Sequence, residues 1–226
     1  MYLRRGLCRS PCLSRLRVQM AIVNGYKYQF LPFGGGQMNE PYWNQMILKK
    51  GGVFIDAGAN VGGWAIPAAR FYERVIAFEP NPNVVSVLHR NVRANKITNV
   101  SILPFALGEG TSRKDLYFYP KNGQDSFLKE HAGIVASGGK IPVQMVALDN
   151  YGYQPSVIKI DTEGYELNVL KGAYNTIQQN RPQLCIETHD ERDVGLIEKM
   201  LDDYHWKSMV REQPGVRQTV LTGMPA

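Results

Sequence analysis

Short, almost continuously apolar runs alternate with segments of helical spacing along most of this 226-residue chain. Strands that are apolar throughout are typical of a parallel sheet covered by helices on both faces. Strands are expected at 53–57, 74–79, 100–107, 156–161 and 182–189, and helices at 62–71, 82–96, 165–179 and 193–204. The pattern therefore predicts an α/β fold with a doubly wound, mostly parallel sheet.

The two ends of the chain depart from this alternation. Near the C-terminus, the strands expected at 206–210 and 217–223 are separated by a short turn and no helix. They predict a hairpin, which places an antiparallel strand in the sheet. Ahead of the first strong strand, residues 20–33 alternate as a hairpin does, and a short helix is expected over 40–50, ending at Gly51-Gly52.

Positive charge is concentrated at the N-terminus. The formal net charge is +6, but residues 1–19 contain five arginines and no acidic residue, so the remainder is close to neutral. We expect this leader to be a disordered tail; a transit peptide, or translated sequence upstream of a start at Met20, are the alternatives. A near-neutral body argues against strong nucleic-acid binding.

Neither hydropathy nor cysteine content indicates a membrane or an oxidising compartment. No run of about 18 apolar residues occurs, so no membrane span is expected. Cys8 and Cys12 lack the further ligands that a zinc site needs, and Cys185 lies in an apolar run typical of a buried thiol. We expect a cytoplasmic protein.

The segment FIDAGANVGG places an acid and several glycines at the end of the first strong strand. Ligands of open α/β sheets bind beyond the carboxyl ends of the strands, and glycines allow a ligand or a backbone to approach closely. Asn60 occupies the second glycine position of a dinucleotide fingerprint, whereas Asp56 suits a cationic ligand. Glu79, 21 residues after Gly58, is placed to accept hydrogen bonds from ribose.

Together these features suggest a nucleoside that carries a charged amino-acid group, as S-adenosylmethionine does. Each residue also has a simpler interpretation when taken alone. Asp56 could merely cap the turn, and Glu79 could be a surface acid.

Several motifs resemble those of FkbM-type S-adenosylmethionine-dependent methyltransferases. They are FIDAGANVGGWAI, VIAFEPNPNVVSVLHRNVRANKITNV, FALGEG, VALDNY, IKIDTEGYELNVLKGA and PQLCIETH, over roughly residues 50 to 190. The resemblance implies a class I methyltransferase, with a seven-stranded Rossmann-like sheet whose last strand is antiparallel, over 53–226. It also implies methyl transfer to oxygen, commonly to a hydroxyl of a sugar or small metabolite, and hence a small-molecule or glycan acceptor.

The resemblance assigns parts of the cofactor to particular residues. The loop from Asp56 to Gly63, which includes Gly58, Asn60 and Gly62, would hold the methionine part, and Glu79 would bind the ribose. Asn81 and the Phe105-Ala106 step would lie near the adenine. Residues 108–150, a polar loop between two strand-like segments, would form a lid or acceptor-binding segment, with 122–128 as its most reactive-looking part.

Methyl transfer to a hydroxyl needs a group that accepts the proton or acidifies it. Asp161 ends one strand, and Glu187 and His189 lie two apart at the end of the next, so that all three could converge. Asp161 or His189 could act as general base; alternatively, Asp161, Glu187 and His189 could bind Mg²⁺ or Mn²⁺, or form a structural network. Glu163 could simply cap the following helix.

Three other functions are less well supported. An NAD-dependent oxidoreductase would favour glycine at position 60, where the chain has asparagine, together with a catalytic Tyr-x-x-x-Lys motif or histidine. An RNA ribose 2′-O-methyltransferase could use Lys159 with Asp161. A non-catalytic binding module with this fold would have no need of the acids at 56, 79 and 161.

Overall fold

The computed structural model describes residues 19–23, 25–30, 50–118, 125–127, 139–213 and 216–226. The leader expected over 1–19 and the helix expected over 40–50 therefore lie almost wholly outside the described residues.

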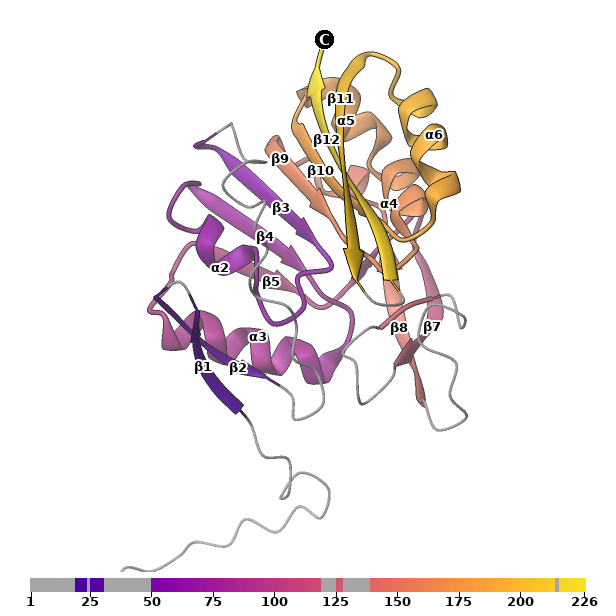
Figure 1. Cartoon of the computed structure of the whole chain (residues 1–226). Coiled ribbons are helices and arrows are strands. Elements are labelled where there is room, and N and C mark those ends of the chain that lie inside the picture. Colours follow the sequence, from indigo (N-terminus) through magenta and orange to yellow (C-terminus); the bar gives the residue numbers. More distant parts are fainter. Residues whose placement is uncertain (1–18, 24, 31–49, 119–124, 128–138, 214–215) are drawn as a thin grey trace, which may run out of the picture.

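A seven-stranded mixed sheet forms the centre of the molecule, in the order β11-β12-β10-β9-β3-β4-β5 (Figure 1). Its strands are β3 (Val53–Ala57), β4 (Arg74–Phe78), β5 (Val100–Leu103), β9 (Pro155–Ile160), β10 (Gln183–Thr188), β11 (Tyr204–Gln213) and β12 (Val216–Pro225). β12 runs antiparallel to both β10 and β11, while β3, β4, β5, β9 and β10 pair in parallel. The terminal hairpin and the antiparallel strand predicted from the sequence are confirmed.

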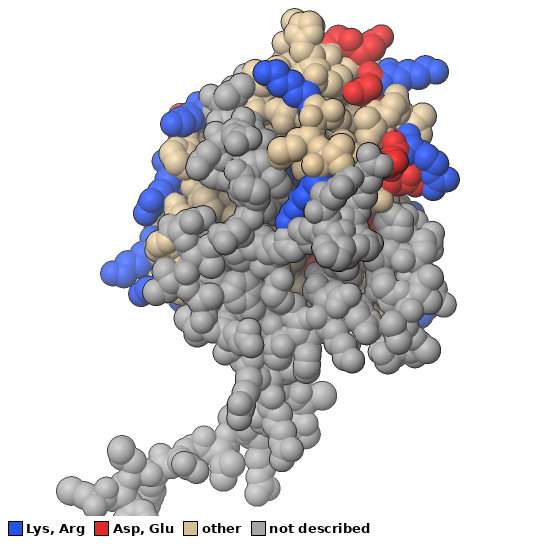
Figure 2. Space-filling view, in the orientation of Figure 1, with Lys and Arg blue, Asp and Glu red and all other residues tan. Residues whose placement is uncertain are grey.

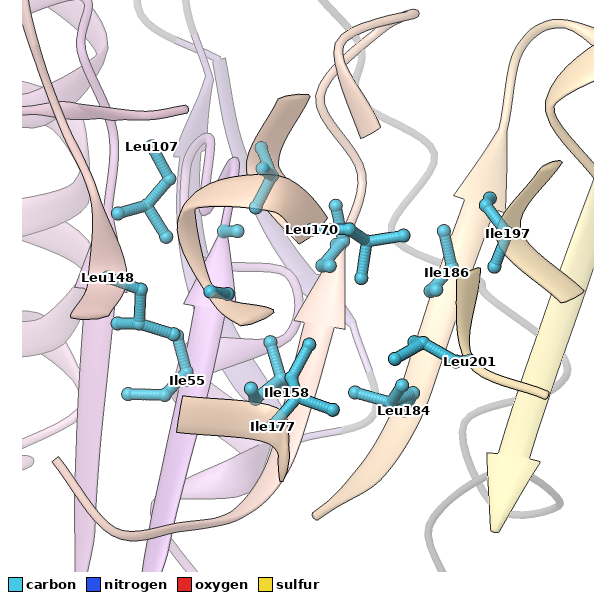
Figure 3. Close-up of a cluster of buried hydrophobic side chains, with 14 of the residues drawn as sticks. Ile55, Leu107, Leu148, Ile158, Leu170, Ile177, Leu184, Ile186, Ile197 and Leu201 are labelled. Atoms are coloured by element: carbon cyan, nitrogen blue, oxygen red, sulfur yellow. The ribbon is translucent and has the colours of Figure 1, made fainter. Parts of the chain in front are cut away.

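Helices cover both faces of this sheet (Figure 1). They are α2 (Ala65–Ala68), α3 (Pro82–Ala94), α4 (Glu166–Gly172), α5 (Tyr174–Asn180) and α6 (Glu191–Met200), with a 3₁₀ turn η1 at Leu148–Tyr151. Successive strand residues pack on opposite faces: Phe54 joins the core beneath α2 and α3, and Ile55 joins the core beneath α4, α5 and α6. Figure 3 shows part of the second core, where Ile158 of β9 lies near Ile177 of α5. The doubly wound architecture is thus built on alternating apolar side chains.

Three of the predicted elements are interrupted in the structure. The helix expected over 62–71 is reduced to α2, because Gly58, Asn60 and Gly62 all have positive φ angles and turn the chain before the helix can begin. The strand expected over 100–107 breaks at Pro104, which has no N–H to donate.

The helix expected over 165–179 is divided into α4 and α5 at Ala173. A side chain at Gly172 would lie 1.8 Å from the carbonyl oxygen of Gly108, so glycine allows the end of α4 to touch the backbone after β6 (Ala106–Leu107). The contact ties the helix to the segment 108–150.

That segment contributes two strands to a separate small sheet, ordered β6-β8-β7. β7 (Ser112–Phe118) and β8 (Gly139–Val146) are antiparallel, and β8 pairs in parallel with β6. Leu116, Val143 and Met145 form a small core there with Tyr165 from the turn before α4. The segment is therefore fixed to the carboxyl edge of the main sheet.

An N-terminal hairpin packs against α3, as the alternation over 20–33 predicts. It consists of β1 (Gln19–Val23) and β2 (Tyr26–Phe30), paired antiparallel. The backbone N–H of Lys27 donates to Asn95 Oδ1 (2.8 Å), and Asn95 Nδ2 donates back to the Lys27 carbonyl (2.7 Å). These bonds attach the hairpin to the end of α3.

The described part of the chain contains no helix with the length and apolarity needed to cross a membrane.

Candidate active site

A cavity of about 680 Å³, open to solvent, lies at the carboxyl ends of β3, β4 and β9. Six residues expected at the site line it, from four separate segments: Gly58, Asn60, Glu79, Phe105, Ala106 and Asp161. The topology thus brings to one place residues that are up to 103 positions apart in the sequence.

The glycine-rich loop after β3 forms one wall of this cavity. Gly58 has φ +77°, and a Cβ there would lie 1.9 Å from the carbonyl oxygen of Asp161. Only glycine therefore lets this loop contact the loop after β9. Asn60, also with positive φ, donates its backbone N–H to Glu79 Oε2 at 2.9 Å, which joins this loop to the end of β4.

Glu79 is held rigidly where β4 ends. It is 6% exposed, and Glu79 Oε1 accepts a hydrogen bond from the backbone N–H of Asn81 at 2.9 Å. Burial raises the pKa of the Glu79 carboxyl to about 8, against the lowering effect of the Asn81 and Asn60 N–H groups. A fixed carboxyl group therefore faces the cavity, ready to accept hydrogen bonds from a bound ligand.

Asp56 is not part of the cavity wall, contrary to the direct ligand contact expected from the sequence. It is fully buried, and its Oδ1 lies 3.1 Å from Nζ of Lys159, its neighbour in register on β9. Burial raises the pKa of Asp56, and Lys159 lowers it. Lys159 Nζ also donates to the Gly58 carbonyl at 3.0 Å. Asp56 therefore contacts the glycine loop indirectly: it pairs with Lys159, and Lys159 in turn donates to the loop.

Two further expected cofactor residues support the cavity from outside its lining. Gly62 packs against α3, where an added Cβ would lie 2.7 Å from Leu88 Cδ1. Asn81 caps α3 by accepting the Asn83 N–H at 3.0 Å, and Asn81 Nδ2 donates to Asp125 Oδ2 at 2.6 Å. Asn81 thus contacts a cavity residue without lining the cavity itself.

The three proposed catalytic residues converge, as their strand positions predict. One ligand atom from each of Asp161, Glu187 and His189 lies within 4.8 Å of the others. Asp161 Oδ1 is 3.9 Å from His189 Nε2, and Asp161 Oδ2 is 3.7 Å from Lys159 Nζ. The Asp161 carboxylate faces the cavity and is oriented from both sides by nitrogen groups.

The surroundings of His189 differ from those of a free imidazole base. Its Nε2 lies 3.1 Å from Glu163 Oε2, and its Nδ1 lies 3.3 Å from Glu166 Oε1. Burial lowers the pKa of His189, but the two glutamates outweigh burial and raise it to about 12. These carboxylates stabilise the protonated form of the ring, so of the two bases weighed from the sequence the geometry favours Asp161.

The contacts of His189 with Glu163 and Glu166 also disfavour a metal ion at this site. A divalent cation at Asp161, Glu187 and His189 would need a lone pair on the ring, but both ring nitrogens face carboxylate oxygens. Glu187 Oε1 is also 3.8 Å from Arg211 Nη1. These residues fit a protonated histidine better than a Mg²⁺ or Mn²⁺ ion, and we derive no chemical step through a metal.

Sequence reasoning missed the role of the turn between β9 and α4. Glu166 is fully buried and accepts the N–H groups of Thr162 and Gly164, both at 3.0 Å, so it fixes the turn as well as His189. Burial raises the pKa of Glu166, but His189 and these N–H groups lower it by more, so the pKa lies below its usual value. The acid spacing in DTEGYE is the only signal of this in the sequence.

Comparison with known proteins agrees with this geometry. The mostly parallel sheet with an antiparallel C-terminal strand is that of class I methyltransferases. The fold is shared with M. jannaschii TYW2, whose crystal structure is of a complex with AdoMet (15% identity, TM-score 0.58, covering 94% of this chain and 88% of that chain).

The FkbM methyltransferase domain profile matches residues 56–207. The chain therefore belongs to the FkbM methyltransferase family and is an S-adenosylmethionine-dependent methyltransferase, so the oxidoreductase alternative is wrong.

Individual relatives share about a quarter of their residues with this chain. The chain is 26% identical over 224 residues to the hexuronic acid methyltransferase AglP of Haloferax volcanii, covering 89% of this chain and 84% of AglP. It is 26% identical over 188 residues to methyltransferase sdnD of Sordaria araneosa, covering 66% of this chain and 71% of sdnD. An FkbM methyltransferase structure from Methylobacillus flagellatus matches with 22% identity and a TM-score of 0.59, covering 80% of this chain and 46% of that chain.

Proposed function

We propose that the protein transfers the methyl group of S-adenosylmethionine to a hydroxyl oxygen of a sugar, glycan or small metabolite. The observation that carries this proposal is the position of Asp161. Its side chain is 23% exposed, lies at the cavity, and is oriented between Lys159 and His189. A carboxylate held in this way is suited to accept a hydroxyl proton.

The reaction follows from that placement. The cofactor's nucleoside would bind along Glu79 and the Phe105-Ala106 step, with its sulfonium directed toward Asp161. As the acceptor oxygen attacks in line, the new O–C bond forms, the S–C bond breaks, and S-adenosylhomocysteine leaves. The hydroxyl proton passes to Asp161, so charge and atoms balance. His189 and Lys159 hold the carboxylate in place throughout.

A sugar acceptor is supported by the relationship to AglP, whose name describes methylation of a hexuronic acid. The RNA alternative is less well supported. Among the described residues on the face in Figure 2, Lys and Arg are spread out or lie beside Asp and Glu, and form no continuous basic track.

A panel of acceptors tests the proposed function. The protein is incubated with methyl-tritiated S-adenosylmethionine and, separately, neutral hexosides, uronic acid glycosides, hydroxylated small metabolites and an RNA transcript. We expect label as a methyl ether on at least one sugar or metabolite and none on RNA. Label confined to RNA, or carried on nitrogen or carbon, would contradict the proposal.

Glu79 makes nucleoside binding depend on pH. A suitable ligand for the test is 5′-methylthioadenosine, which has the ribose of the cofactor but no titrating amino-acid group. Because the pKa of Glu79 is raised to about 8, the carboxyl is mostly protonated in the free protein at lower pH, and binding to its charged form then costs deprotonation. Calorimetry should show affinity rising about 25-fold between about pH 6.5 and about pH 8.5.

The matched variant is Glu79→Gln, which cannot titrate and should bind weakly with a flat profile. A slope that persists unchanged in this variant would assign the titration to another group, such as Asp125, whose pKa burial also raises.

A further inference from the structure

The segment 125–127 of the inserted region reaches the cavity opposite the glycine loop. Asp125 and Phe127 both line the cavity, and Ser126 between them is fully buried. The Ser126 hydroxyl donates to the Glu163 carbonyl at 2.6 Å, and its backbone pairs with Tyr117 of β7 through two 2.9 Å hydrogen bonds. Phe127 packs against Tyr165 with ring centroids 4.8 Å apart. The two residues that follow Asp125 are therefore fixed in place.

Asp125 lies beside Glu79 at the same end of the cavity. Asn81 connects the two acids: its side-chain Nδ2 donates to Asp125 Oδ2 at 2.6 Å, and its backbone N–H donates to Glu79 Oε1 at 2.9 Å. Asn81 thus satisfies one oxygen of each carboxyl, and the Asn60 N–H satisfies the other oxygen of Glu79. Two acids facing one partly buried space disfavour each other's ionisation, and hydrogen-bond donors of a ligand between them would offset that cost.

We propose that Asp125 is a second nucleoside-binding carboxylate, which accepts a hydrogen bond from the adenosine of the cofactor across from Glu79. The donor would be either a ribose hydroxyl or the adenine amino group, which are the O–H and N–H donors that adenosine carries. The proposal rests on the proposed placement of the cofactor. It gives the inserted segment 108–150 a part in cofactor selection as well as any part in acceptor binding.

The role of Asp125 is not explained by Asn81 alone. A neutral side chain could accept the Asn81 amide without bringing a second negative charge next to Glu79. Asp125→Asn keeps an oxygen for Asn81, so it removes the charge with little change in shape. A ligand contact and a merely structural role therefore predict different results for this variant.

The experiment measures binding of S-adenosylhomocysteine and three analogues to the full chain by calorimetry. The analogues are S-inosylhomocysteine, in which an oxo group replaces the amino group, and the 2′-deoxy and 3′-deoxy forms. We expect Asp125→Asn to weaken S-adenosylhomocysteine binding by about 10- to 100-fold. The loss should disappear for the one analogue that lacks the group Asp125 contacts, which identifies the donor.

Asp115→Asn is the control, because Asp115 lies on β7 and pairs with Lys140 at the surface, with 40% of its side chain exposed. It should bind every ligand as the unmodified protein does. Binding of S-adenosylhomocysteine by Asp125→Asn within about twofold of normal would overturn the proposal. So would an equal loss for all four ligands, because it would show that Asp125 acts only through Asn81.

Failure of the unmodified protein to bind S-adenosylhomocysteine would instead overturn the cofactor placement, and this proposal with it. Asp125→Ala provides a second variant, which should show the same dependence on the analogue.

Discussion

Asp161→Asn should lower kcat roughly 1,000-fold while leaving the affinity for S-adenosylhomocysteine within about twofold of normal, since general-base groups contribute about 10²- to 10⁴-fold. The amide keeps the shape of the side chain but cannot take up the acceptor proton. Glu79 and the Phe105-Ala106 step, along which we propose that the nucleoside binds, are not altered. Steady-state rates with an acceptor from the panel, combined with calorimetry, separate the two effects.

Glu198→Gln is the control for this variant, because Glu198 is an exposed acid on α6. It should change neither rate nor affinity. A rate in Asp161→Asn within about threefold of normal would remove Asp161 from the mechanism. A large loss of cofactor affinity would show that Asp161 holds the cofactor rather than the proton.

Lys159→Met should destabilise the fold by about 3–5 kcal/mol, because it leaves the Asp56 carboxylate buried without its cation. Asp56 is fully buried, and the Lys159 side chain is only 5% exposed, so solvent cannot replace the lost charge. The loss is a large fraction of a typical domain's total stability. Urea unfolding followed by circular dichroism measures it.

Lys171→Met is the control for that change, since Lys171 is 49% exposed and lies 3.9 Å from Glu109 at the surface. It should cost at most about 1 kcal/mol. Adding Asp56→Asn to Lys159→Met should recover part of the lost stability. The loss in Lys159→Met should also shrink as the pH is lowered, because a protonated Asp56 has no charge to compensate. A cost equal to that of Lys171→Met would contradict the buried pair.

Much of the fold follows from local patterns. Continuous apolar runs located the buried strands, and the missing helix between the last two strands identified the terminal hairpin. The pattern failed where backbone geometry overrides periodicity. The apolar spacing continues through Ala173, yet the helix is interrupted there, next to the contact that Gly172 makes with the backbone of Gly108. That contact joins residues 64 positions apart and leaves no local signal.

In the candidate site, too, the residues at strand ends were predictable and those placed by long-range contacts were not. Strand ends placed Glu79 and Asp161 at one edge of the sheet, because parallel strands end together. The sequence could not show that Asp56 faces Lys159 rather than the ligand, since this depends on the register between β3 and β9. Nor could it place Asp125, because the segment 125–127 reaches the cavity through contacts of Ser126 with Tyr117 and Glu163, which leave no local signal.

We propose that Glu79 and Asp161 line a single binding site for an adenosyl cofactor. A crystal structure of the protein with S-adenosylhomocysteine tests it most directly. We predict the ribose hydroxyls within hydrogen-bonding distance of Glu79, the adenine beside Phe105 and Ala106, and the sulfur directed toward Asp161. A nucleoside bound away from Glu79, or a sulfur on the far side of the cavity from Asp161, would contradict the account.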